Sequence, residues 1–138
     1  MKIARAIILA AVFAGAGGCA TSDGGIKLSQ GEQRLERYEP YVGEPVDRVI
    51  APRLDSWQPI SRTQLVLWTS INDAYLFTVD NTCPELQFAH TVGVTSTTSS
   101  ITTFDSVIVR GERCRILQMQ PIDVERMKAD RRAAEARD

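Results

Sequence analysis

Short apolar runs separated by polar residues fill the middle of the chain. Two of them, residues 64–68 (QLVLW) and 74–79 (AYLFTV), are separated by the mostly polar residues 69–73. Two apolar runs with a short polar loop between them predict a β-hairpin. Residues 65–68 are apolar without a break, which indicates a strand with both faces covered.

A second hairpin is predicted further along the chain. Its strands are residues 106–109 (SVIV) and 113–119 (RCRILQM), and residues 110–112 (RGE) form its turn. The glycine in this turn can adopt a positive φ. Side chains alternate across a strand. The side chains expected to share one face of the second strand are those of Cys114, Ile116 and Gln118.

Two further regions are also predicted to form strands. Residues 47–51 (DRVIA) are short and β-branched, and they predict a single strand. Residues 88–104 are rich in Thr and Ser and are interrupted by apolar residues. Because Thr favours strands, this tract predicts a strand, a tip at residues 97–100 and another strand. A mobile loop and a polar surface that faces sugars are the alternatives.

Helical patterns flank the strand region. Leu35, Tyr38 and Tyr41 recur at a spacing near three, which predicts a short helical turn within residues 30–41. Proline at positions 40 and 45 ends this turn.

Asp123 is a candidate N-cap for a C-terminal helix. Val124 and Met127 are expected to pack on the sheet from this helix. Residues 129–138 (ADRRAAEARD) have no apolar stripe, so we expect a charged, solvated or frayed tail there. A helix that binds a partner is the alternative.

Regularly spaced short strands with one terminal helix predict a mainly β fold (β-rich α+β). We expect a small antiparallel barrel or a curved sheet with a C-terminal helix. The domain is predicted over residues 32–128, followed by the tail at 129–138.

The N-terminus has the pattern of an export signal. Lys2 and Arg5 flank the start of an uninterrupted apolar run over residues 6–16. That run is too short to cross a bilayer, which takes about 20 apolar residues. We therefore predict a signal peptide over residues 1–18.

Cys19 follows small residues in a pattern that resembles a bacterial lipobox, AGGC over residues 16–19. This likeness implies that the Cys19 thiol is lipidated and that residues 19–31 form a lipidated, flexible tether. Cleavage near Ala16 or Ala20, which would leave Cys19 as a free thiol, is the alternative. By resemblance to lipoprotein sorting, Ala20 after the cysteine implies an outer-membrane lipoprotein facing the periplasm. The alternatives are a protein anchored in the inner membrane and a soluble protein of the periplasm.

The charge balance changes once the signal is removed. The whole chain has 16 basic and 17 acidic residues. Without residues 1–18, which contain two basic residues, 14 basic and 17 acidic residues remain, a net charge of −3. This acidic balance disfavours a nucleic-acid partner. One small domain also excludes a multidomain enzyme.

The other two cysteines, Cys83 and Cys114, favour a disulfide, because an even number of cysteines in an exported domain usually pairs. A metal site made from these two residues and His90 is the alternative. It lacks a fourth ligand and the short spacing typical of structural zinc. No metal and no cofactor is therefore expected.

Catalytic patterns are weak. His90 is the only histidine, and no nucleophile motif accompanies it. Acidic residues at 39, 44, 47 and 55 alternate with arginines at 37, 48 and 53, which is typical of a solvated, ion-paired surface rather than of a catalytic carboxylate pair. We therefore expect no enzyme, and a hydrolase is the less favoured alternative.

Two features are candidates for surface binding. Arg110, Arg113 and Arg115 form a basic cluster that suits lipid phosphates or an acidic partner. Trp57 lies in a turn-like stretch, where it can stack on a sugar or anchor a partner. The alternatives are ordinary outward-facing arginines and a tryptophan that covers one end of the barrel.

Several short motifs are spread over residues 35–128, and they include YVGEPV at 41–46, WQP at 57–59, CPEL at 83–86 and RGERCRI at 110–116. In these motifs the chain resembles a family of small proteobacterial lipoproteins known only as a domain of unknown function. The resemblance supports the location and the extent of the domain, and it implies no catalytic residues.

Together these patterns predict a non-enzymatic, lipid-anchored protein of the cell envelope. We expect the domain to serve as an interaction or structural module that is held at the membrane by its N-terminal lipid and binds an unknown envelope protein. The alternative is a small-ligand-binding periplasmic β-barrel.

Overall fold

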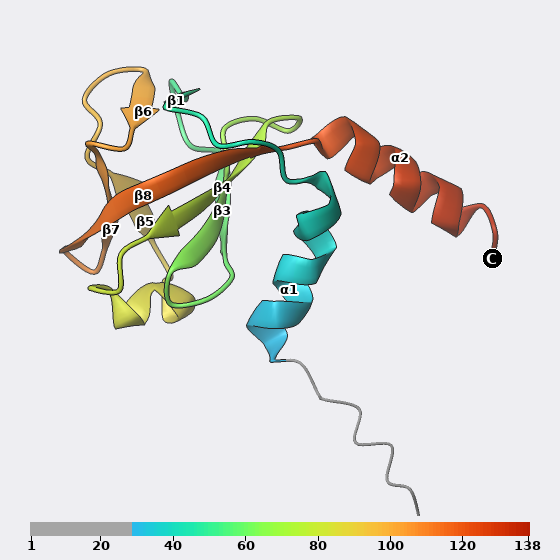
Figure 1. The fold of residues 1–138 in the computed structure, drawn as a ribbon, viewed down its shortest axis with the longest axis horizontal. Helices are drawn as coiled ribbons and strands as arrows, with labels where there is room; N and C mark the ends of the chain where they lie inside the picture. The colour runs from blue at the N-terminus through green and yellow to red at the C-terminus, as the bar shows by residue number, and fades with distance from the viewer. Residues whose placement is uncertain (1–28) are drawn as a thin grey trace, which may run out of the picture.

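The computed structural model describes residues 29–138, and their fold is mainly β. Six antiparallel strands form a strongly curved, barrel-like sheet in the order β2-β3-β4-β8-β7-β5, and β1 pairs with β6 beside it (Figure 1). The predicted fold class is therefore confirmed. In chain order the strands are β1 (Arg48–Ile50), β2 (Ser56–Pro59), β3 (Gln64–Trp68), β4 (Ala74–Val79), β5 (Val92–Val94), β6 (Ser100–Thr102), β7 (Ser106–Val109) and β8 (Glu112–Ile122).

Both predicted hairpins are present. Strands β3 and β4 have the predicted bounds and pair from Trp68 and Ala74 outward. In the β7–β8 hairpin, Glu112 pairs with Val109, so the turn contains only Arg110 and Gly111, with φ of 53° and 82°. Two consecutive positive φ angles suit the twist of a tight hairpin. The prediction that Glu112 belongs to the turn was wrong.

A bulge in β8 changes which side chains face inward. Val79 pairs with Ile116 and Thr78 pairs with Gln118, so Leu117 is an extra residue in β8. Beyond this bulge the buried position moves to Met119, because an extra residue reverses the alternation of a strand. Gln118 is only half-buried, and the prediction that it continues the buried face of Cys114 and Ile116 was wrong.

The Thr- and Ser-rich tract contains two strands, but they do not pair with each other. Strand β5 pairs with β7, and β6 pairs with β1. The tract also begins differently from the prediction, because Phe88 ends a 3₁₀ helix, η2 (Pro84–Phe88). Partners distant in sequence therefore decide how this tract is placed.

Buried side chains fill both sides of the sheet. An inner cluster, which lies within the curve of the sheet, includes Leu65, Leu67 and Phe77. A second cluster includes Val66 and packs beneath the two helices. Strand β3 thus contributes to both clusters, which confirms its predicted covering on both faces. Each large apolar side chain buried in this way contributes about 1.5–3 kcal/mol.

The N-terminal helix α1 (Gln30–Tyr38) is longer than the predicted turn, and the 3₁₀ helix η1 (Glu39–Tyr41) follows it. Ser29 caps α1, since its hydroxyl accepts from the Glu32 N–H at 3.3 Å. The Glu32 carboxylate accepts in return from the Ser29 N–H at 2.7 Å. These hydrogen bonds from Ser29 lower the pKa of Glu32. Residues 30 and 31 belong to this helix and not to the predicted tether.

The C-terminal helix α2 (Val124–Glu135) begins at the predicted N-cap, where the Asp123 carboxylate accepts from the Arg126 N–H at 3.0 Å. Val124 and Met127 are buried, as predicted. The helix continues past Lys128 to Glu135, so most of the predicted tail is helical, and its side chains from Ala129 onward are exposed. Figure 1 shows α2 projecting from the body of the molecule.

Within residues 29–138, no helix combines the length and the apolar character needed to cross a membrane.

Candidate functional site

Helix α1 lies along the edge strand β2. A Cβ atom on Gly31 would overlap the carbonyl oxygen of Ile60, so the two backbones are in close contact. One turn further on, the Arg34 guanidinium donates to the Pro59 carbonyl at 3.0 Å. Positions three to four residues apart share one face of a helix. This face of α1 therefore covers an edge of the sheet, a position that natural proteins generally protect.

The same face of α1 ends in an aromatic contact. The Tyr38 hydroxyl donates to the side-chain oxygen of Gln58 on β2. Burial raises the pKa of Tyr38, and the positive charges of Arg37, Arg131 and Arg34, together with a hydrogen bond from Trp68, oppose that rise. Tyr38 is therefore a neutral phenol at physiological pH, and its hydroxyl is already engaged.

Helix α2 is attached to η1 by a second aromatic side chain. The Tyr41 hydroxyl donates to the Asp130 carboxylate at 2.9 Å. The guanidinium of Arg126 lies over the Tyr41 ring, 5.4 Å from its centroid, in a cation–π arrangement. The hydrogen bond to Asp130 is the main cause of a raised pKa at Tyr41. These contacts attach α2 to η1.

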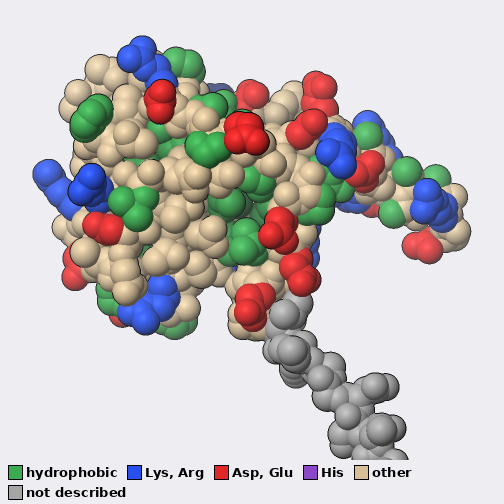
Figure 2. Space-filling view, viewed as in Figure 1, with side chains coloured by type: hydrophobic (Ala, Val, Ile, Leu, Met, Phe, Trp, Pro, Cys, Tyr) green, Lys and Arg blue, Asp and Glu red, His purple; other side chains and the backbone are tan. Residues whose placement is uncertain are grey.

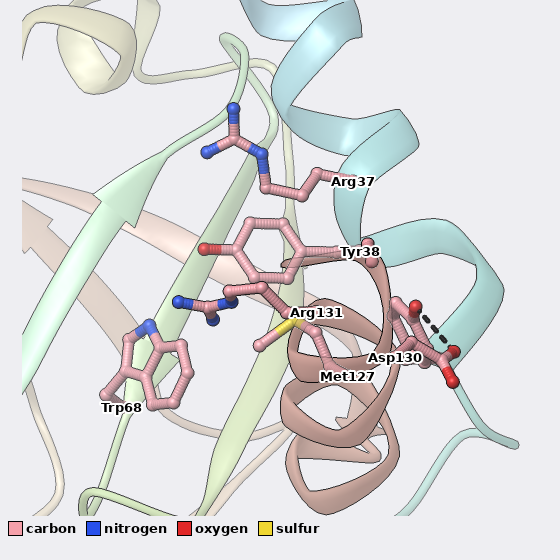
Figure 3. A pocket seen from close by; sticks show the side chains of 8 residues that line it. Arg37, Tyr38, Trp68, Met127, Asp130 and Arg131 are labelled. Carbon is pink, nitrogen blue, oxygen red and sulfur yellow. Dashed lines mark hydrogen bonds between the residues drawn. The ribbon is translucent and has the colours of Figure 1, made fainter. Parts of the chain in front are cut away.

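A groove of about 570 Å³ opens between the two helices (Figure 3). Its floor is formed by the Tyr38 ring, Trp68 and Met127, and Arg37 and Arg131 contribute its guanidinium groups. In Figure 3 these two guanidinium groups lie on opposite sides of the Tyr38 ring. The complete lining is Arg37, Tyr38, Tyr41, Trp68, Met127, Asp130, Arg131 and Ala134.

The groove has an excess of positive charge. Within the part of the chain that the structure describes, the only ion pair joins Arg110 and Glu85, so Arg37 and Arg131 have no carboxylate partner. The only carboxylate in the lining, Asp130, accepts the Tyr41 hydrogen. Figure 2 shows acidic and basic side chains interspersed over the visible face. The positive charge of the groove comes from Arg37 and Arg131.

Trp57, predicted as a binding residue, does not line this groove. It lies in strand β2 and not in a turn, and it pairs with Leu67. It is half-buried and packs against the inner cluster. These contacts favour the interpretation of Trp57 as a cover for the core.

The three predicted binding arginines lie at the β7–β8 hairpin, outside the groove lining. Arg110, at the hairpin turn, pairs with Glu85 at 3.1 Å. Arg113 and Arg115 are exposed on the face of β8 opposite Cys114. Arg115 lines a shallow hollow with Phe104, whose side chain is 97% exposed.

The predicted disulfide is confirmed: Cys83 and Cys114 are bonded, with their Cα atoms 5.7 Å apart. Both cysteines are buried in the inner cluster. The alternative metal site is excluded at these residues, because the sulfurs are bonded to each other and His90 is exposed on a loop. Among residues 29–138, no three His, Cys, Asp or Glu side chains gather in a way that could hold a metal ion.

The acidic and basic residues between positions 37 and 55 are exposed, as predicted. The prediction that they form ion pairs was wrong for the described structure, where they lie apart in solvent. The predicted signal peptide at residues 1–18, Cys19 and most of the tether lie outside the described residues.

Sequence reasoning indicated Tyr38 and Met127 separately as packing residues. It missed the groove, because Tyr38, Trp68 and Met127 are far apart in the chain and meet only when both helices lie against the sheet.

The whole chain, residues 1–138, matches the family model described as a family of unknown function, DUF6491. The chain therefore belongs to this family. No curated protein and no solved structure matches it.

Proposed function

We propose that this member of the DUF6491 family is a non-enzymatic, lipid-anchored protein of the cell envelope that binds another envelope component in the groove between α1 and α2. The observation that carries the binding role is the pair Arg37 and Arg131. Their guanidinium groups have no carboxylate partner within residues 29–138 and lie over an aromatic floor. Interaction sites often combine arginine with aromatic residues in this way.

The anchor is supported by the sequence of residues 1–19. A lipid on Cys19 would be followed by ten residues before α1 starts at Gln30. Ten fully extended residues span at most about 35 Å. Because α1 forms one wall of the groove, the groove would stay within reach of components at the membrane surface. We place the protein at the outer membrane, facing the periplasm.

The non-enzymatic assignment draws on what the reactive side chains do. The sulfurs of Cys83 and Cys114 are joined to each other, so neither is a free nucleophile. His90 is exposed on the loop between η2 and β5, away from the groove lining. Tyrosine, arginine and tryptophan side chains dominate the groove, and they suit binding more than acid–base chemistry.

A small-ligand carrier is the second candidate, and the volume of the groove favours it. Ligand pockets typically measure about 300–1,000 Å³, and the groove measures about 570 Å³. The inner side of the sheet is filled by buried side chains such as Leu67, Phe77 and Met119. A small ligand would therefore bind between the helices and not in the interior of a barrel.

Metabolic labelling with an alkyne fatty acid tests the anchor. The wild-type chain should take up the label and fractionate with membranes, whereas a Cys19→Ser chain should do neither. Labelling of the Cys19→Ser chain would refute attachment at this residue.

Site-specific photo-crosslinking in intact envelopes tests the binding role. A benzoylphenylalanine at Ala134, which lines the groove, should form a discrete adduct. The same group at Ala129, which lies on another side of α2, is the matched control. The adduct should disappear when Arg37 and Arg131 are both changed to Gln. Equal adducts at both positions, or an adduct that survives the double change, would refute the groove as the binding site.

A further inference from the structure

We propose that the groove between α1 and α2 recognises a single carboxylate attached to a flat, apolar body. This inference rests on the proposed binding role of the groove and specifies the chemistry of what binds there. It is carried by the charges and shapes of the lining side chains.

The charge of the groove matches a monoanion. Arg37 comes from α1 and Arg131 from α2, so the two positive groups approach the groove from opposite walls. Asp130 offsets one of them and is itself held by Tyr41. One positive charge therefore remains for a ligand. A guanidinium fork matches the geometry of a carboxylate and can form two parallel hydrogen bonds with it.

The other lining groups select an apolar body. The Tyr38 hydroxyl already donates to Gln58, and Tyr38 is only 6% exposed, so a small part of its ring lines the groove. Trp68 is only half-buried and offers the larger apolar surface, and the largely buried Met127 contributes to the lining beside it. Aromatic and methionine side chains bind flat apolar groups through dispersion and offset stacking.

The geometry also separates this site from ordinary solvated arginines. Arg132 is on the same helix as Arg131, yet it lines a different hollow with Asn72 and Glu125 and has no aromatic floor. Arg131 and Arg132 thus form a matched pair, adjacent in sequence and alike in charge. Only Arg131 should contribute to recognition of the ligand.

The test uses the full chain with Cys19→Ser, titrated with 1-naphthoate. 1-Naphthamide has nearly the same shape without the charge, and 1-naphthyl phosphate carries a larger charge. Binding is followed by NMR through the two indole N–H signals. The Trp68 signal should move on adding 1-naphthoate, and the Trp57 signal should stay, because Trp57 packs on the other cluster.

We expect 1-naphthoate to bind at least about tenfold more tightly than 1-naphthamide, since charge-assisted hydrogen bonds are roughly twice as strong as neutral ones. Arg37→Gln and Arg131→Gln should each remove most of this preference. Arg132→Gln should change neither. All three positions are exposed, so thermal unfolding should show intact folds.

Several results would overturn the inference. Equal binding of 1-naphthoate and 1-naphthamide would show that the groove does not select a carboxylate. Tighter binding of 1-naphthyl phosphate would show that it prefers a phosphate. If Arg132→Gln loses as much of the preference for 1-naphthoate as Arg131→Gln does, the preference comes from the overall positive charge and not from the groove. If 1-naphthoate fails but the Ala134 crosslink remains arginine-dependent, this inference fails and the proposed binding role stands. If 1-naphthoate binds as expected but the crosslink is absent, the proposal that an envelope component binds in the groove is refuted, and the inferred ligand chemistry stands.

Discussion

The phenol of Tyr41 donates a hydrogen bond to the carboxylate of Asp130, at 2.9 Å and across 89 positions of the chain. This contact joins η1, near the start of the fold, to the middle of α2, near its end. It also fixes the spacing of the groove, because both residues belong to its lining. A helix as short as α2 is marginal in water without tertiary contacts.

Removing this hydrogen bond should loosen the second half of α2. In Tyr41→Phe, amide hydrogen exchange should become several-fold faster over residues 128–135. Residues 124–127 should change little, because Val124 and Met127 remain buried. Asp130→Asn keeps an acceptor oxygen and should have a smaller effect. Unchanged exchange in Tyr41→Phe would show that the hydrogen bond does not hold the helix.

Changing Gly31 to Ala should destabilise the protein even though alanine is the better helix former. Alanine gains about 1 kcal/mol over glycine inside a helix. At this position, however, its Cβ would overlap the Ile60 carbonyl oxygen, which belongs to the backbone and cannot rotate away. Overpacking of this kind costs about 1–3 kcal/mol, and the intrinsic gain is smaller near the end of a helix.

Urea unfolding measures this effect. Gly93→Ala is the matched control, because its Cβ would lie 3.8 Å from the Cβ of Ile108, an ordinary contact. A Gly31→Ala chain that is as stable as the wild type, or more stable, would contradict the close contact between α1 and β2.

Loss of the disulfide should cost a large part of the folding free energy. The bond closes a loop with a sequence separation of 31 residues, and such a loop contributes about 3–4 kcal/mol in the chain-entropy model. The double variant Cys83→Ala, Cys114→Ala should therefore unfold at a clearly lower urea concentration. In the Cys19→Ser background, the denatured but unreduced chain should react with no thiol reagent. Reaction at two thiols would disprove the bond.

Stability should fall as the pH rises above about 10. Each of the three tyrosines has a pKa above its ordinary value: burial is the main cause for Tyr38 and Tyr75, and the hydrogen bond to Asp130 for Tyr41. A pKa that is raised in the folded state means that the fold retains the proton more firmly than the unfolded chain does. The resulting stability is complete below the unfolded pKa of about 10, and it is lost as the pH rises through the folded pKa.

Absorbance at 295 nm follows all three phenols, since the chain has no other tyrosine. Their ionisation should begin above the range of a free tyrosine and should coincide with unfolding measured by circular dichroism. In Tyr38→Phe, the loss of stability per pH unit should be smaller. A folded chain whose tyrosines all titrate at or below about pH 10 would contradict this prediction.

The parts of the fold that depend on neighbouring residues could be predicted from the sequence. Strands β3 and β4 have the predicted bounds, and Asp123 caps α2 as expected. Periodicity, turn residues and capping act over a few positions, so they can be recognised in a single chain. The pairing of Cys83 with Cys114 followed from counting, because the predicted lipidation of Cys19 left only two candidates.

Other features depended on contacts between distant segments. The bulge at Leu117 reverses the alternation of β8, and no local pattern marks it. Strands β5 and β6 find partners in β7 and β1 rather than in each other. Trp57 and the arginines at 110, 113 and 115 had suitable chemistry, but none of them lines the groove between α1 and α2.

The sequence by itself thus determined the fold class, the disulfide and the positions of the main hairpins. The tertiary structure alone decided where the groove between α1 and α2 lies. Arg37 and Arg131 are 94 positions apart, and they face one groove because Gly31 of α1 contacts Ile60, just after β2, while Tyr41 holds α2. The physical reason is that secondary structure follows from interactions between near neighbours, whereas a groove between helices depends on long-range packing.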